Sequence, residues 1–183
     1  CLCGKRRPIV STIARISGGK MDVAKFTSKQ MNTLRKIFHA FNPFMILMWR
    51  LGMGRMINIL PPVIGRIMVI KHHGRKSGKE YFTPVNYAIV DDEIYCTAGF
   101  GSISDWYKNI LVNPNIELWL PGAKPKARAE DISDSPNRLP LLRQVIIASG
   151  FAGPLFGVNP KKLTDEQLDA VSKEYRLVHF RFT

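Results

Sequence analysis

Acidic side chains are scarce in this chain, and their scarcity predicts an anionic partner. The 183 residues carry 14 Asp and Glu against 27 Lys and Arg, which gives a formal net charge of +13 at pH 7. A solvated surface does not require so uneven a balance, so nucleic acid, anionic lipid and a polyanionic coenzyme are the candidate partners. Residues 1–66 hold twelve basic side chains and one acid, Asp22. An anionic membrane surface is therefore the leading partner for residues 5–55, and no nucleic acid is expected because no RNP-like motif is present.

Long hydrophobic runs are also lacking. The most apolar stretch, residues 44–54, has about eleven residues, whereas a helix that crosses a bilayer needs about 20. No signal-peptide pattern is visible either. We therefore expect a cytoplasmic protein without a transmembrane helix, whose membrane contact is limited to its surface.

Cysteine and metal-binding patterns are sparse. Cys1, Cys3 and Cys96 form neither a metal spacing nor an even disulfide framework, which indicates a reducing compartment. His72 and His73 are adjacent, and adjacent strand residues face opposite ways. No metal site is expected.

Neither a P-loop nor a Rossmann glycine motif occurs, but one short basic turn stands out. Residues 74–78 read Gly-Arg-Lys-Ser-Gly, so two cations and a hydroxyl lie between two glycines. Such a turn can direct backbone N–H groups and cationic side chains to one side and hold a phosphate or carboxylate. A solvated hairpin turn explains the spacing equally well.

Two strands and a helix follow this turn. Residues 80–90 and 93–98 alternate and are rich in aromatic and β-branched side chains, which predicts a β-hairpin. Pro84 cannot donate to a ladder, so its strand is expected to be bulged or at an edge there. Residues 104–113 predict one short helix, whose free N–H groups would favour an anionic ligand.

A family resemblance rests on four pieces: Gly74–Gly78, Thr83-Pro84, Trp106–Asn109 and Asn113-Pro114-Asn115. In this order they resemble the deazaflavin-dependent nitroreductase family of flavin/deazaflavin oxidoreductases, over about residues 67–120. The resemblance implies a split β-barrel and coenzyme F420, a deazaflavin with a phosphate and an oligoglutamate tail. It also implies an F420-dependent oxidoreductase that transfers a hydride to a lipophilic acceptor such as a quinone, a nitroaromatic or an activated alkene.

By position, the resemblance also implies a set of coenzyme-binding residues. Arg75, Lys76 and Ser77 would hold the phosphate and the acidic tail. The next strands would line the deazaflavin and the helix start would close the pocket, through Tyr81, Phe82, Thr83, Pro84, Val85, Asn86, Thr97, Ala98, Gly99, Phe100, Asp105, Trp106, Tyr107, Lys108 and Asn109.

Three of these positions, Tyr81, Asn86 and Gly99, differ from the family pattern, which has Arg, Tyr and Ser there. The differences keep two alternatives open. One is a split barrel that binds FMN or another flavin-like ligand, and the other is a non-enzymatic module that binds lipid or nucleic acid through its basic surface.

The remaining segments are expected to complete a mainly β fold with flanking helices. Residues 1–60 would form a basic N-terminal helical extension, and residues 61–183 the split β-barrel domain, closed by five or six strands. In the extension, residues 5–20 are expected to be mobile or loosely packed, and two helices, 27–41 and 44–54, would be separated at Asn42-Pro43.

The chemistry would belong to the coenzyme, so no obligatory catalytic side chain is expected. Tyr87 or Tyr107 could supply a proton to the reduced acceptor. Phe151 and Phe156, in an apolar glycine-rich loop, could wall the substrate pocket, although loop aromatics that plug a core are more common. Both a monomer and a homodimer are compatible with the sequence.

Overall fold

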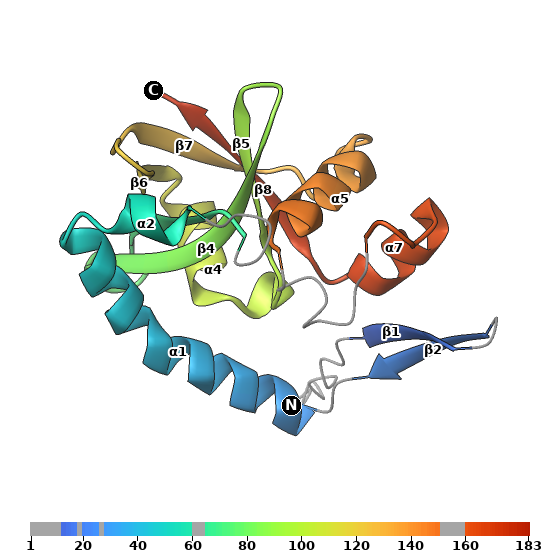
Figure 1. Cartoon of the computed structure of the whole chain (residues 1–183). Helices are drawn as coiled ribbons and strands as arrows, with labels where there is room; N and C mark the ends of the chain where they lie inside the picture. The colour runs from blue at the N-terminus through green and yellow to red at the C-terminus, as the bar shows by residue number, and fades with distance from the viewer. Residues whose placement is uncertain (1–11, 18–19, 26–27, 60–64, 151–159) are drawn as a thin grey trace, which may run out of the picture.

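The computed structural model describes residues 12–17, 20–25, 28–59, 65–150 and 160–183. Six antiparallel strands close into a barrel in the order β3-β4-β5-β8-β7-β6 (Figure 1). They are β3 (Ile67–His73), β4 (Glu80–Val90), β5 (Glu93–Ala98), β6 (Asn115–Trp119), β7 (Lys126–Asp131) and β8 (Arg176–Phe182). The expectation of a mainly β split barrel with flanking helices is confirmed.

The interior of the barrel is filled by alternate residues of its strands. Along β5, Ile94, Cys96 and Ala98 are buried while their neighbours are half-exposed, as period-2 side-chain alternation requires. Phe180 of β8 and Met68 of β3 are completely buried in the same cluster. This cluster holds the strands in one register, because a slip of one residue would turn its apolar side chains outward.

Two helices from the C-terminal part of the chain cover one outer face of the barrel. α5 (Arg138–Ala148) packs on β4 and β5, and α7 (Asp165–Ser172) packs on α5. Their buried side chains form a second apolar cluster with Ala88 and Leu177. Thr164 and Gln167 form a reciprocal capping box that starts α7.

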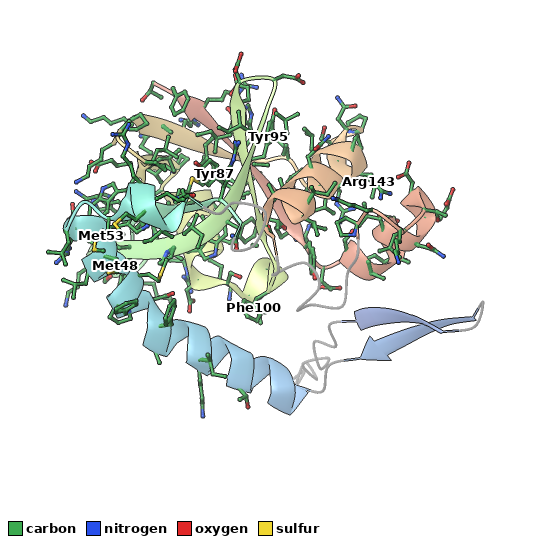
Figure 2. All side chains as sticks on the ribbon, in the orientation of Figure 1. Met48, Met53, Tyr87, Tyr95, Phe100 and Arg143 are labelled. Carbon is green, nitrogen blue, oxygen red and sulfur yellow. The ribbon has the colours of Figure 1, made fainter. Side chains whose placement is uncertain are left out.

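A long helix, α1 (Ser28–Arg50), runs beside the barrel and leads through a turn into the short α2 (Gly54–Ile57) (Figure 1). Trp49 packs with Val69 of β3 and Trp119 of β6 in a third cluster, which fixes the end of α1 against the barrel. Met48 and Met53 lie at the junction of α1 and α2 (Figure 2).

The expected helix break at Asn42-Pro43 is wrong, because α1 contains Pro43 in its interior. Proline removes one backbone hydrogen bond and usually ends a helix. Here the segment after it is held by tertiary packing, since Met45 and Trp49 are buried. Local sequence preference is overridden by this burial.

A small antiparallel sheet of two strands, β1 (Thr12–Ser17) and β2 (Lys20–Lys25), lies apart from the barrel in Figure 1. The expectation that residues 5–20 are loosely packed missed this hairpin. Its strands pair in register from Thr12 with Lys25 to Ser17 with Lys20. Basic residues within these strands obscured their alternation in the sequence.

Candidate functional site

A cavity of about 650 Å³ lies between the first half of β4 and the start of α4 (Asp105–Val112). That volume is in the usual range for small-molecule and cofactor sites. The cavity is lined by Asn42, His72, Gly74, Arg75, Lys76, Ser77, Tyr81, Phe82, Thr83, Pro84, Val85, Asn86, Thr97, Gly99, Phe100, Ser104, Asp105, Trp106, Asn109, Ile146, Ser149 and Tyr175. Figure 2 shows Phe100 beside α4, on the side of the barrel toward α1.

The cavity follows an unpaired edge of β4. Residues 80–86 pair with β3 only, because β5 joins β4 from Tyr87 to Val90. The edge predicted at Pro84 is therefore confirmed, and its missing N–H costs no ladder bond on the open side. The backbone of this edge is available to a ligand.

All but three of the residues predicted to bind the coenzyme line this cavity. Ala98, Tyr107 and Lys108 do not. Ala98 points into the barrel by strand alternation, and it belongs to the interior cluster. In α4, residues 105, 106 and 109 share the face toward the cavity, whereas Tyr107 and Lys108 lie on other faces, as helical periodicity requires.

The two tyrosines considered as proton sources are also outside the cavity lining. Tyr87 is buried in the barrel, where desolvation raises the pKa of its hydroxyl. Tyr107 donates its hydroxyl hydrogen to Asp131 Oδ2 at 2.5 Å, and burial together with this bond raises the pKa of Tyr107 to about 12. Neither tyrosine lines the cavity, so a role for either hydroxyl as a proton source stays a prediction. Phe151 and Phe156 lie outside the described residues.

Several lining residues were missed by sequence reasoning: Asn42, His72, Gly74, Ser104, Ile146, Ser149 and Tyr175. A signal existed for His72, because Met68 and Ile70 are two and four residues before it and both are buried in the barrel. Alternation therefore places the ring of His72 on the inner face of β3. No local signal marks Asn42, Ile146 or Tyr175, which come from distant parts of the chain.

The basic turn between β3 and β4 is compact. Gly74 N–H donates to the carbonyl of Lys79 at 2.8 Å, and Gly78 N–H donates to the carbonyl of Gly74 at 2.9 Å. Gly78 has φ +65°, which favours glycine. At Gly74 a Cβ would lie 2.7 Å from both Ser77 Oγ and the ring of Tyr81, so only glycine lets these two side chains approach.

Arg75 is held by α4. Its backbone N–H donates to Asn109 Oδ1 at 3.2 Å, and its guanidinium donates to the same oxygen at 2.9 Å. The guanidinium also forms an ion pair with Asp105 at 3.3 Å. Arg75 therefore fixes the turn to the helix, while the exposed Lys76 projects its charge at the cavity rim.

Behind the turn, Asn109 and His72 continue this chain of contacts into the protein. Asn109 Nδ2 lies 3.4 Å from His72 Nδ1, and His72 Nε2 lies 3.0 Å from Thr83 Oγ1. His72 is only 2% exposed, and desolvation lowers the pKa of its ring to about 4. His72 is therefore neutral at physiological pH.

A six-stranded barrel with a cavity along an open strand edge, a basic turn at its rim and aromatic walls defines a small coenzyme-binding barrel. The chain belongs to the F420H(2)-dependent quinone reductase family, whose profile matches residues 50–149, more than half of the chain. The coenzyme of this family is F420. No curated protein matches the sequence significantly.

Solved structures with similar folds belong to proteins that are named for several different ligands. An F420-H2 dependent reductase, FDR-A, shares 16% identity at a TM-score of 0.45, covering 63% of this chain and 92% of its own. HutZ, a heme storage protein from Vibrio cholerae, shares 14% identity at a TM-score of 0.43, covering 64% and 81%. A FAD-binding protein from Mesorhizobium loti shares 13% identity at a TM-score of 0.45, covering 67% and 85%. Sequence identities and TM-scores this low do not indicate which ligand this chain binds or which reaction it catalyses.

The lining residues fit a deazaflavin coenzyme in kind. A flat ring suits the cleft between β4 and Trp106, whose walls are aromatic and aliphatic. A phosphate or carboxylate suits Lys76 and Ser77 at the rim. Among the described residues, no three His, Cys, Asp or Glu side chains gather where a metal ion could bind.

Proposed function

We propose that this chain is an F420H2-dependent reductase that acts on a lipophilic acceptor, such as a quinone, a nitroaromatic or an activated alkene. The observation that carries the proposal is that the family match, residues 50–149, contains the basic turn, the open strand edge and the start of α4 that together line one cavity. When bound, the coenzyme supplies a hydride to the acceptor.

The protein's own contribution is binding, orientation and exclusion of water. Lys76 and Ser77 would hold the anionic part of the coenzyme, while Arg75 keeps the turn in place. The ring would lie along residues 81–86, with Phe100 and Trp106 opposite. No charged acid or base is required at the acceptor, and a proton can come from solvent.

The proposed acceptor is lipophilic because α1, α2 and the residues just after each helix present an exposed apolar surface beside the cavity. Its members are more than half exposed, namely Ile37, Phe41, Phe44, Leu47, Leu51, Met56 and Ile59. Arg50 and Arg55 are exposed in the same segment, and Asn42 of α1 lines the cavity. An amphipathic basic helix of this kind suits an anionic membrane surface.

This surface would lie on the membrane and not cross it. None of the helices in the described part of the chain is both long enough and apolar enough to span a bilayer. We propose a cytoplasmic protein that takes its acceptor from the membrane surface along α1.

Fluorescence titration of the purified protein with F420, followed by anaerobic oxidation of F420H2 with menadione, tests the enzymatic proposal. Binding in the micromolar range or tighter and menadione-dependent oxidation are expected. No binding would reject the proposal. Because Tyr81, Asn86 and Gly99 differ from the family pattern, FMN is the second candidate. Bound FMN would be seen in the purified protein as an absorption peak at about 450 nm, against roughly 400–420 nm for F420.

Co-sedimentation with vesicles tests the membrane proposal. Phe41→Ser/Phe44→Ser should release the protein from phosphatidylglycerol vesicles, because these rings, 5.5 Å apart, would enter the bilayer interface. Leu111→Ser/Val112→Ser is the matched control, since both side chains are more than half exposed at the end of α4. Equal loss in both variants, or no wild-type binding, would contradict the proposal.

A further inference from the structure

The contacts among Arg75, Asn109, His72 and Thr83 determine where the hydrogens lie. Asn109 Oδ1 accepts two bonds from Arg75, at 3.2 Å from the backbone N–H and at 2.9 Å from the guanidinium. The opposite amide orientation would set the NH2 group against two donors, so it is excluded. Asn109 therefore presents its Nδ2 donor to His72 Nδ1.

The tautomer of His72 follows from this donor. A neutral imidazole has one N–H and one acceptor nitrogen, and the nitrogen facing a donor must be the acceptor. With Nδ1 accepting from Asn109 Nδ2, 3.4 Å away, the hydrogen of the neutral ring is placed on Nε2. Burial keeps the ring neutral, since the pKa of His72 is lowered to about 4.

The orientation of the Thr83 hydroxyl is the next step. His72 Nε2 lies 3.0 Å from Thr83 Oγ1. With the ring hydrogen on Nε2, His72 donates this bond, so Thr83 accepts it and keeps its own hydrogen. Within the described part of the chain, His72 is the one side-chain hydrogen-bond partner of Thr83 Oγ1. Thr83 is half-buried on the open edge of β4 and lines the cavity.

We propose that His72 is a positioning residue whose Nε2–H tautomer, selected by Asn109, makes the Thr83 hydroxyl a hydrogen-bond donor to an acceptor atom of the bound coenzyme. The acceptor is a carbonyl oxygen or an unprotonated ring nitrogen of the deazaflavin. This proposal rests on the proposed function for the identity of the ligand. The tautomer and the orientation of Thr83 are properties of the protein alone.

Long-range proton–nitrogen NMR of the ligand-free protein tests the tautomer without any coenzyme. With 15N-labelled histidine at pH 8, the His72 ring should be protonated on Nε2 and not on Nδ1, with His72→Gln used to assign its signals. Asn109→Asp keeps an oxygen for Arg75 and places a second oxygen against Nδ1, so this variant should move the hydrogen to Nδ1. A wild-type ring protonated on Nδ1, or on both nitrogens, would overturn the proposal.

F420 titrations of Thr83 and His72 variants test the donor. Thr83→Val should weaken binding about three- to tenfold, the usual effect of one hydrogen bond, while Thr83→Ser should bind as wild type does. His72→Phe should weaken binding to a similar extent. His72→Gln places an amide donor near the position of Nε2 and should restore most of the loss.

Coupling between the two positions separates positioning from a general structural effect. If His72 acts through Thr83, adding Thr83→Val to His72→Phe should produce little further loss. Additive losses, or normal binding by Thr83→Val, would overturn the proposal. Failure of the wild type to bind F420 would reject the proposed ligand and leave the NMR result for the tautomer intact.

Discussion

Arg75 and Asn109 are joined by two hydrogen bonds to one amide oxygen, at 3.2 Å from the Arg75 backbone and 2.9 Å from its side chain. Asp105 pairs with the same guanidinium at 3.3 Å. The guanidinium of Arg75 is therefore already bound by two side chains of the protein. Lys76, exposed at the rim of the cavity, is the cation better placed to meet an anionic ligand.

Lys76→Ala should weaken F420 binding about five- to tenfold at low ionic strength, and the difference from wild type should shrink as salt is added, because an exposed charge is screened. The melting temperature should stay within about 1 °C, since few contacts are lost. Lys79→Ala is the matched control, because Lys79 is exposed in the same segment but does not line the cavity. Equal effects of both variants would show that only the overall charge matters.

Arg75→Ala should instead lower the free energy of unfolding by about 1 kcal/mol, because the buried Asn109 loses its guanidinium donor and only the backbone N–H of residue 75 still joins the turn to α4. The partly exposed ion pair with Asp105 adds little, since solvent screens it. Urea unfolding measures the change. Asp105→Asn should cost clearly less, and a reversed order would mean that the ion pair, not Asn109, holds the turn.

Gly74→Ala and Gly78→Ala should separate crowding from backbone strain in one turn. At Gly74 the new methyl group would meet Ser77 Oγ and the Tyr81 ring at 2.7 Å, so both side chains must move and F420 binding should weaken. At Gly78 the methyl group meets nothing within 4 Å, but φ is +65°. That variant should lose about 1 kcal/mol of stability and retain its affinity. Titration should therefore separate the two variants, because only Gly74→Ala is expected to lose affinity for F420.

The barrel could be predicted from the sequence because the alternation of side chains is visible within individual strands. Residues 80–90 and 93–98 alternate and are joined at Asp91-Asp92, and both aspartates adopt positive φ in the observed turn. Alternation is a property of neighbouring residues, so it survives without knowledge of the fold. The β1–β2 hairpin and the uninterrupted α1 were missed because basic residues and Pro43 gave contrary local signals.

The candidate site was predictable where it is contiguous in sequence. The residues of the basic turn and of β4 were identified from a resemblance, and they line the cavity. Asn42 reaches the same cavity from α1, Ile146 from α5 and Tyr175 from the position just before β8, and only the closed barrel brings them together. Tyr107 was misplaced because a helix start was treated as one surface, although its neighbouring residues face different directions.

Cys96 should resist thiol reagents until the barrel opens. Its side chain is completely buried, and desolvation raises the pKa of the thiol far above its ordinary value. In a Cys1→Ser/Cys3→Ser variant, which leaves Cys96 as the single thiol, reaction with Ellman's reagent should be slow in buffer and complete in denaturant. Rapid reaction in buffer would mean that the barrel interior opens readily.

The stability of the protein should depend on pH through His72. In the unfolded chain a histidine has a pKa of about 6.5, and in the folded protein desolvation lowers the pKa of His72 to about 4. Between these pH values the unfolded state binds more protons than the folded state. The contribution of a neutral, buried His72 to stability is therefore fully present above pH 6.5 and is lost as the pH falls toward 4. A difference of this size corresponds to about 3 kcal/mol, because one pKa unit is about 1.4 kcal/mol.

Urea unfolding of wild type and His72→Gln at several pH values between 4.5 and 7.5 isolates this contribution. Other titrating groups are common to both proteins, so the difference between the two curves belongs to His72. The variant is expected to be less stable at pH 7.5, because it replaces a buried side chain that contacts both Asn109 and Thr83. The gap should narrow as the pH falls, since wild type loses the free energy of keeping a neutral ring buried. Parallel curves would show that His72 does not remain uncharged in the folded protein.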